Sequence, residues 1–179
     1  MCRIPPQAGE NPLTPAGRAA YRPGMSEDQQ PFVPEGFDVP RTLAGDGFRL
    51  EPLGAEHNAR DLAAWSGSIA HVRATPGFAG RDWPPPEGMS AEANLADLER
   101  HARDFAERRG FTYSVLEGDE DVIGCLYVYP SKERAGRVHV SSWVREDRAH
   151  LDAPVYEAVS AWLREVWPFE TGLVDYAPR

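Results

Sequence analysis

The chain has 179 residues, and its 19 Lys and Arg against 28 Asp and Glu give a formal net charge of −9. This length suits one domain, and the acidic balance excludes a typical nucleic-acid binding surface, which would be basic. No stretch approaches the roughly 20 uncharged apolar residues that a membrane-spanning helix needs. We therefore expect a soluble protein whose partners include neither nucleic acid nor a membrane.

Cysteine and histidine are too sparse for a disulfide framework or a metal centre. The two cysteines, Cys2 and Cys125, cannot build a four-cysteine site, and the five histidines show no metal-ligand spacing. We expect a reducing, cytoplasmic setting and no metal. Cys125, between Gly124 and Leu126, is interpreted as a small buried hydrophobe, and His101 as a solvent-facing residue of a helix.

The first part of the chain differs in composition from the rest. Eight of the 17 prolines lie in the first 40 residues, where no helical or strand periodicity occurs. We predict a disordered or extended tail over residues 1–46 and one domain over residues 47–179. The segment before Met25 lacks the apolar block of a secretory signal. Two alternatives stay open: Met25 rather than Met1 is the true start, or the tail docks in a groove through Phe32, Val33 and Phe37.

The first half of the domain predicts one strand and three helical segments. Residues 48–53 alternate apolar and charged side chains, as a strand does. Residues 55–72 carry apolar residues at helical intervals around an interruption at 66–68, which predicts two short helices. The segment 75–89 is rich in Pro and Gly and is expected to be a long loop. Ser90 then caps a strongly amphipathic helix that ends at Gly110.

The second half predicts a meander of strands, a helix and one further strand. Residues 111–116 and 122–129 form a β-hairpin, and residues 137–145 alternate as a third strand. Apolar residues then recur at helical spacing from Asp152 until Pro168 ends the helix. Residues 173–176 make a last short strand. The fold class is therefore α/β, a mixed sheet in the order β-α-α-β-β-β-α-β with helices on both faces.

The order of these elements resembles that of the GNAT N-acetyltransferase superfamily over about residues 47–176. Five local sequences strengthen the resemblance by their order along the chain: FRLEPL, TPGF, ANLADLE, VIGCLYVYP and VSSWVR. The resemblance implies an acyl-CoA-dependent N-acyltransferase. Acetyl-CoA would be its co-substrate, and the acceptor would be an amine of a small molecule or peptide.

The resemblance also implies where acyl-CoA binds. Its arm would lie in a splay between the last two strands, and its pyrophosphate would bind backbone N–H groups ahead of the long helix, where the helix dipole favours an anion. The loop departs from the family because it has no glycine and carries Glu146 and Asp147. The residues assigned to the cofactor in this way are Trp143, Val144, Arg145, Arg148, Ala149, His150, Leu151 and Asp152.

Acyl transfer to an amine needs a group that takes a proton from the ammonium ion. His139 on the third meander strand and Asp175 on the last strand are the two catalytic candidates. The structural alternative for His139 is a satisfied strand histidine, and that for the loop 75–89 is a segment anchored by two buried aromatics. The resemblance places the acceptor against two aromatic side chains and one carboxylate of this loop, those of Phe78, Trp83 and Asp82.

The end of the sequence bears on assembly and on activity. The family normally continues with a further helix and two strands that often supply a tyrosine, whereas this sequence ends at residue 179. We expect the last strand to present an unpaired edge that a second subunit of a homodimer covers. Two functions stay open: the N-acyltransferase, and a catalytically inactive GNAT-like dimeric binding or interaction domain, which the glycine-free loop favours.

Overall fold

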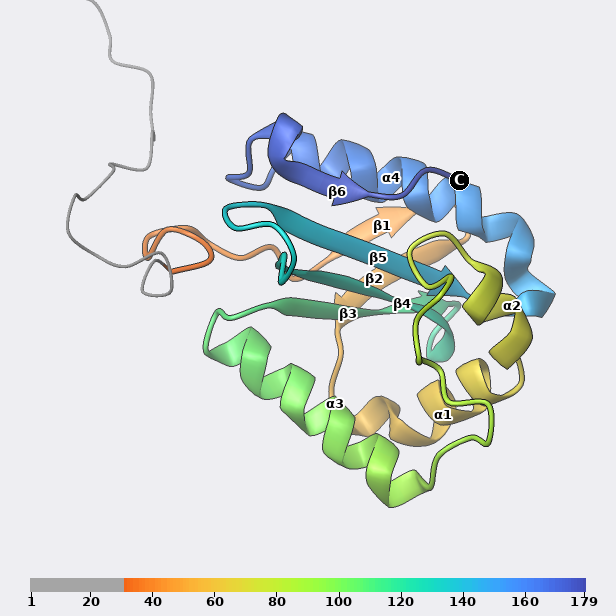
Figure 1. The fold of residues 1–179 in the computed structure, drawn as a ribbon. Helices are drawn as coiled ribbons and strands as arrows, with labels where there is room; N and C mark the ends of the chain where they lie inside the picture. Colours follow the sequence, from red (N-terminus) through yellow and green to blue (C-terminus); the bar gives the residue numbers. More distant parts are fainter. Residues whose placement is uncertain (1–30) are drawn as a thin grey trace, which may run out of the picture.

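A six-stranded mixed sheet with helices on both faces makes up residues 31–179, the part of the chain that the computed structural model describes (Figure 1). The strands are β1 (Leu43–Gly45), β2 (Phe48–Pro52), β3 (Phe111–Glu117), β4 (Asp121–Pro130), β5 (Val138–Val144) and β6 (Val174–Tyr176). The helices are α1 (Asn58–Ser66), α2 (Ile69–Ala74), α3 (Ala91–Ala106) and α4 (Asp152–Glu165). Three short 3-10 helices complete the set: η2 (Ala55–His57), η3 (Glu146–Leu151) and η4 (Thr171–Leu173). The predicted mixed α/β class is confirmed.

The strands lie across the sheet in their order along the chain, from β1 to β6. Every neighbouring pair is antiparallel except β5 and β6, which are parallel. A parallel pair needs a crossover connection, and η3 with α4 supplies it. Among residues 31–179, none of the helices combines the length and apolar composition needed to span a bilayer.

Each face of the sheet packs a separate hydrophobic core. On one face α4 places Val155 and Val159 against strand residues that include Val140 and Val144. On the other face α1 and α3 cover a cluster that includes Trp143. Successive residues of β5 therefore point to opposite faces, even-numbered valines toward α4 and odd-numbered side chains toward α1 and α3.

Cys125 lies in the core on the α1 and α3 side and is fully buried. Burial raises the pKa of its thiol well above the ordinary value. The interpretation of Cys125 as a small buried hydrophobe is confirmed.

Helix α3 begins where its sequence predicts. The Ser90 Oγ accepts a hydrogen bond from the Ala93 N–H at 3.2 Å, which satisfies one of the unpaired donors of the first turn. The helix buries Asn94, Leu98 and His101 toward the sheet. The solvent-facing placement of His101 was therefore wrong, because the side chain lies beside the apolar stripe and not opposite it.

The expected domain boundary at residue 46 differs from the structure. Val33 is fully buried in the core under α4, and Phe32 and Phe37 pack against the same core. β1 adds a strand next to β2. Residues 31–46 therefore pack on the domain, and Phe32, Val33 and Phe37 are among the side chains that attach them. Residues 1–30, with Met1 and Met25, lie outside the described residues.

One buried carboxyl group holds α1 and α3 together. Asp61 is 4% exposed, and its Oδ2 accepts a hydrogen bond from Asn94 Nδ2 at 3.1 Å. The Asn94 Oδ1 in turn accepts from the Trp65 indole N–H at 3.0 Å. Burial raises the pKa of Asp61 from 3.8 to about 6, although the hydrogen bond from Asn94 lowers it in part. The folded state therefore binds this proton more tightly than the unfolded state.

The raised pKa makes the ionisation of Asp61 a cost to stability. That cost is absent below pH 3.8, where both states are protonated, and complete above pH 6, where both are ionised. A shift of about 2 units corresponds to about 3 kcal/mol. We expect Asp61→Asn to raise the free energy of unfolding by about 2 kcal/mol at pH 8 and by much less at pH 4, measured by urea denaturation. Asp119→Asn in the exposed β3–β4 turn is the control, and an equal effect of Asp61→Asn at both pH values would contradict the assignment.

Candidate functional site

The parallel pairing of β5 with β6 covers only the first part of β5. Three residue pairs join the two strands, from Val138 with Val174 to Val140 with Tyr176. β5 continues beyond this pairing to Val144, whereas β6 ends at Tyr176. The last part of β5 therefore has no strand on its β6 side within residues 31–179.

The antiparallel pairing with β4 decides which main-chain groups face this open edge. The Arg145 N–H donates to the Ile123 carbonyl of β4 at 2.8 Å. Because hydrogen-bonded pairs alternate along an antiparallel ladder, the main-chain groups of Ser142 and Val144 point away from β4. These two residues form the open edge of β5. Figure 1 shows the chain after β6 ending close to this edge and to α4.

A buried arginine already occupies the open edge. Arg179 donates from Nη2 to the Ser142 carbonyl oxygen at 2.6 Å and to the Ser142 Oγ at 2.9 Å. Its Nε lies 2.7 Å from Asp152 Oδ2, and the Arg179 side chain is 4% exposed. The guanidinium stands over the rings of Tyr156 and Tyr176, 5.8 and 5.6 Å from their centroids. A ligand that pairs with Ser142 has to displace Arg179.

The turn from β5 into α4 is folded as the 3-10 helix η3 and carries the remaining residues assigned to acyl-CoA. The Glu146 N–H, the first amide of this turn, donates to the Ser68 Oγ at 3.0 Å. Ala149 and His150 are exposed, whereas Leu151 is buried in the core under α4. Part of the turn therefore faces solvent, but its first N–H is already hydrogen-bonded.

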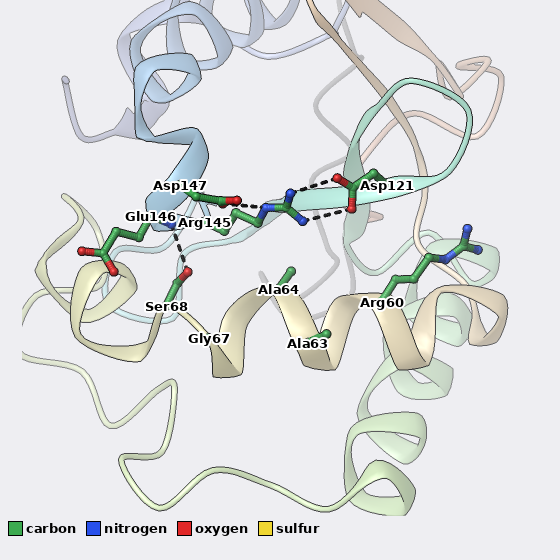
Figure 2. A pocket seen from close by; sticks show the side chains of 9 residues that line it. All are labelled: Arg60, Ala63, Ala64, Gly67, Ser68, Asp121, Arg145, Glu146 and Asp147. Carbon is green, nitrogen blue, oxygen red and sulfur yellow. Dashed lines mark hydrogen bonds and ion pairs between the residues drawn. The ribbon is translucent and has the colours of Figure 1, made fainter.

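Both arginines of this turn are held by carboxylates. Arg145 bonds Asp121 at 2.9 Å and Asp147 at 2.7 Å, and Arg148 bonds Glu117 at 2.7 Å. Figure 2 shows Arg145 between its two acidic partners, at the edge of a cavity of about 560 Å³ that separates α1 from the turn. The charges of Arg145 and Arg148 are therefore neutralised locally. An anionic ligand would compete with these carboxylates for the two arginines.

Trp143 and Val144 differ in what they offer a ligand. The Trp143 side chain is fully buried, and its main chain faces β4. Val144 has its main chain at the open edge. Ser142 shares that position, and sequence reasoning missed it because the register of β4 against β5 decides which residues face the edge. Counting back two residues from Val144, which the sequence did assign to the edge, would have identified it.

A second cavity, of about 770 Å³, lies between α3, the loop 75–89, β4 and β5, and we call it the α3 pocket. Phe78 and Trp83 line it, with ring centroids 5.6 Å apart, and Tyr127 of β4 stands 6.3 Å from each of them. Asp82, the third residue assigned to the acceptor, is exposed and does not line this pocket. Ser141 lines it from β5.

His139 lines the α3 pocket but has its ring nitrogen engaged. Its Nε2 lies 3.0 Å from Arg81 Nη2. A guanidinium only donates, so Nε2 accepts and carries no proton. Burial, and then the charge of Arg81, lowers the pKa of His139 below its ordinary value. His139 is therefore a neutral imidazole whose free lone pair is already used.

Asp175 pairs with His139 in the β5–β6 register, but its carboxylate is bound by two arginines. Arg137 donates to it at 2.6 Å and Arg134 lies 2.7 Å away. The hydrogen bond from Arg137 is the main cause that holds the pKa of Asp175 below its ordinary value. The geometry therefore gives Asp175 a place in an ion-pair cluster outside the α3 pocket. Within residues 31–179 no three His, Cys, Asp or Glu side chains are placed to hold a metal ion.

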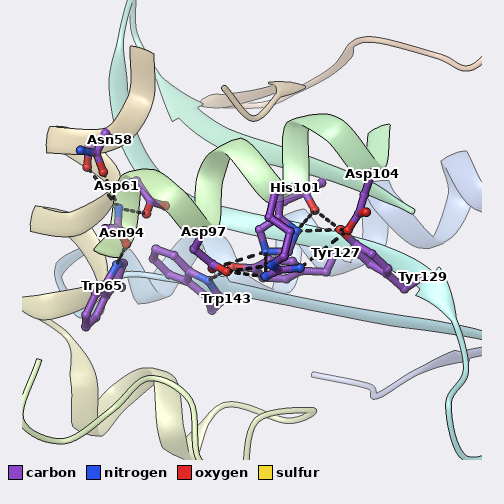
Figure 3. A network of polar contacts seen from close by, with 12 residues as sticks. Asn58, Asp61, Trp65, Asn94, Asp97, His101, Asp104, Tyr127, Tyr129 and Trp143 are labelled. Carbon is purple, nitrogen blue, oxygen red and sulfur yellow. Dashed lines mark hydrogen bonds and ion pairs between the residues drawn. The ribbon is translucent and has the colours of Figure 1, made fainter. Parts of the chain in front are cut away.

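A polar network on the wall of the α3 pocket went unnoticed in the sequence. His101 is 8% exposed; its Nδ1 lies 2.6 Å from the Tyr129 hydroxyl, and its Nε2 lies 3.6 Å from Asp97 Oδ2. The Tyr129 hydroxyl donates to Asp104 Oδ2 at 3.2 Å. Figure 3 shows His101 between Asp97 and the pair of Tyr129 and Asp104. The spacing of Asp97 and His101, one helical turn apart, was the available signal.

Comparisons with known proteins identify the fold. No family model matches the chain, and no curated protein matches it either. Among solved structures, a GNAT-family acetyltransferase from Chromobacterium violaceum superposes with a TM-score of 0.55 at 20% identity, covering 97% of this chain and 75% of that one. The ribosomal-protein-S5-alanine acetyltransferase from Vibrio fischeri gives a TM-score of 0.51 at 11% identity, over 70% of this chain and 67% of that one.

A third structure carries ligands. The microcin C7 self-immunity acetyltransferase, solved with acetyl-CoA and AMP, gives a TM-score of 0.52 at 10% identity, over 73% of this chain and 68% of that one. The chain thus spans about two thirds of the length of several of these proteins, and at such identities the likeness speaks for the fold alone. The element order, the open parallel pair and these superpositions agree: this chain has the fold of the GNAT N-acetyltransferase superfamily.

Proposed function

We propose that this protein is an acyl-CoA-dependent N-acyltransferase that uses acetyl-CoA and acetylates an amine. The observation that carries the proposal is the open edge of β5, which lies at the start of α4 and borders the α3 pocket through the neighbouring residue Ser141. One strand thus offers main-chain groups to an extended ligand on its edge and side chains to a second ligand on its face. Transfer between two bound substrates needs this proximity.

The residues at the open edge fit the amide-bearing arm of acyl-CoA. Ser142 and Val144 direct main-chain groups toward it, and an extended chain of amides can pair with a strand edge as an added strand does. When bound, the cofactor supplies an acyl group activated as a thioester. The start of α4 and the two arginines of the preceding turn, Arg145 and Arg148, are the groups that would hold the phosphates.

Arg148 allows the phosphate contact to be tested, because it is bound only to Glu117 and Asp147 at the surface. We expect acetyl-CoA to bind with a Kd on the order of micromolar, and Arg148→Glu to weaken binding about tenfold, since it replaces an attraction by a repulsion. Isothermal titration calorimetry measures both values. Arg103→Glu on the exposed face of α3 is the matched control. Equal affinity of Arg148→Glu and the unchanged protein would remove Arg148 from the site.

Substitution of Arg179 provides a second test, in which the acetyl-CoA affinity is expected to rise and not to fall. Because its guanidinium occupies the Ser142 carbonyl, removing the charge while keeping an apolar stem should free the open edge. We expect Arg179→Met to tighten acetyl-CoA binding about tenfold, which corresponds to one charged hydrogen bond of about 1.5 kcal/mol. Arg164→Met on the exposed side of α4 should leave the affinity unchanged. Weaker binding by Arg179→Met would show instead that Arg179 contacts the ligand.

A catalytically inactive binding domain is the second candidate, and the occupied edge favours it. Arg179 satisfies Ser142, the Glu146 N–H is bound to Ser68, and the arginines of the turn are paired with acids. An interaction domain of this fold would keep all of these contacts. Absence of any heat at millimolar acetyl-CoA would favour this second function over the first.

Either function is compatible with a homodimer, which we infer from the position of β6. It is the last strand of the sheet formed by residues 31–179, and strand edges are usually covered in folded proteins. We expect light scattering at micromolar concentration to give the mass of a dimer. The mass of a strict monomer would contradict this assembly.

A further inference from the structure

We propose that the α3 pocket binds a monoamine carried on an apolar, aromatic body, and that His101 accepts the proton of its ammonium group. The proposal rests on the N-acyltransferase function and names the acceptor class and the proton acceptor of that same site. The pocket itself, its charge and the hydrogen-bond pattern of His101 each support one part of it.

The floor of the pocket is apolar and aromatic. Phe78, Trp83 and Tyr127 stand within 6.3 Å of one another, and Met89 adds a flexible apolar side chain beside them. Aromatic rings offer flat apolar surface for another ring, and their faces also attract an ammonium group. The cavity of about 770 Å³ is large enough for an aromatic amine. These features favour an acceptor amine that has an aromatic ring as its apolar body.

The charge of the pocket argues against a polyamine. Its charged lining consists of Asp97 and Glu133 against Arg81, Arg100 and Lys132, so the acidic groups do not outnumber the basic ones. A polycation would meet three positive side chains, whereas a single ammonium group needs only one carboxylate partner. The pocket therefore suits an acceptor with one positive charge.

As at His139, an arginine contacts the unprotonated ring nitrogen of His101, but at His101 the Asp97 carboxylate also lies 3.6 Å from that nitrogen. Arg100 Nη2 lies 3.1 Å from Nε2, and because a guanidinium only donates, Nε2 accepts. The proton of the neutral ring is then on Nδ1, which donates to the Tyr129 hydroxyl at 2.6 Å or to Thr112 Oγ1 at 3.0 Å. His101 lines the pocket, and Nε2 is the unprotonated atom of its ring.

Asp97 stabilises the protonated ring. Burial by itself would raise the pKa of Asp97, but its neighbours His101 and Arg100 outweigh burial and lower the pKa to about 2. Asp97 therefore stays ionised at any working pH, 3.6 Å from His101 Nε2. A proton that arrives on Nε2 exchanges the contact with Arg100 for an ion pair with Asp97.

The network also provides an exit for the proton. When Nε2 is protonated, the proton on Nδ1 can pass to the Tyr129 hydroxyl, whose own proton is directed at Asp104 Oδ2 at 3.2 Å. Asp104 is 14% exposed and pairs with Arg109 at the surface. Tyr129 and Asp104 are positioning residues in this scheme, because they act on His101 and not on the substrate.

The reaction balances with one proton released. An ammonium ion and a thioester become an amide and a thiol: the C–N bond forms, the C–S bond breaks, and the sulfur takes the second proton of the amine. The first proton of the ammonium group is the one that His101 accepts before the nitrogen can react.

Several charged or titratable groups face His101 from the elements around it. Helix α3 contributes Asp97, Arg100 and Asp104, β4 contributes Tyr127 and Tyr129, and α1 contributes Asp61. The lining of the pocket adds Lys132, Glu133, Arg81 and His139. Substitution of His101 is therefore required to separate its contribution from the contributions of these groups.

Acceptor choice is tested with three aromatic monoamines, phenethylamine, tyramine and tryptamine, against spermidine. Release of free thiol from acetyl-CoA measures the rate, and mass spectrometry identifies the acetylated product. We expect kcat/KM for the best aromatic amine to exceed that for spermidine by about a hundredfold, since spermidine places extra charges among basic side chains. Preference for spermidine, or acetylation of none of the aromatic amines, would overturn the acceptor assignment.

The role of His101 is tested with His101→Gln, which keeps a polar group toward Tyr129. We expect kcat to fall by about 10²- to 10⁴-fold and the rise of kcat/KM with pH to disappear, while calorimetry gives an unchanged acetyl-CoA affinity. His71→Gln on α2 is the matched control, because His71 does not line the pocket. Tyr129→Phe should lower kcat about tenfold without changing the acetyl-CoA affinity.

The outcomes distinguish a failure of the transferase function from a failure of the role assigned to His101. If acetyl-CoA does not bind the unchanged protein, the transferase function fails and this proposal fails with it. If acetyl-CoA binds and amines are acetylated, but His101→Gln keeps the rate and pH profile, only the role of His101 is overturned. Nitrogen-15 NMR of the unchanged protein gives a readout independent of activity and of variant folding. A proton on Nε2 instead of Nδ1 in the neutral ring would also overturn the assignment.

Discussion

The early end of the pairing between β5 and β6 is the constraint on which the candidate site depends. Main-chain N–H and C=O groups need partners, and a strand that outlasts its neighbour leaves them unpaired. β6 offers three residues, so in the described part of the chain Ser142 and Val144 at the end of β5 have no strand on their β6 side. In the structure a guanidinium satisfies Ser142. The same requirement is what makes the position attractive to an extended ligand with amides of its own.

The alternation of β5 joins this edge to the α3 pocket. Ser142 directs its main chain to the edge, and its neighbour Ser141 lines the pocket on the face toward α1 and α3. In the proposed function, successive residues of one strand would therefore contact two different ligands without any rearrangement of the sheet. This arrangement depends on the register with β4, which decides the direction of the main-chain groups along β5.

The regular elements could be predicted because their patterns are local. The Ser90 cap and the amphipathic stripe of α3 are visible within one short segment of sequence. The same holds for the alternation of the three central strands. β1 escaped prediction because three residues cannot show an alternation, and it pairs only through its neighbour β2. Residues 31–46 looked like a tail because five of the 16 are Pro or Gly and no periodicity is visible, although a few apolar side chains suffice to attach them to the core.

The site was harder to predict because its contacts join distant parts of the chain. His101 stands three residues from Leu98, at the border of the apolar stripe, and only Thr112 and Tyr129 from two strands show that it is buried. The position of Arg179 at the open edge could not be predicted from the sequence either, since its partners lie on β5 and α4. Residue type and spacing located the region of the site, whereas long-range partners decided which side chains remain available.

The shortness of β6 also has a consequence for motion. Three residue pairs, the ion pair of Asp175 within the strand with Arg137, and the ion pair of Arg179 beyond it with Asp152 attach it to the body of the protein. A segment with so few backbone bonds opens at a lower free energy than the central strands, as a small cooperative unit of its own. Its amide protons would exchange with solvent ahead of those of β3 and β4, and any ligand that replaces Arg179 at the edge of β5 would loosen one end of that attachment while providing a new one.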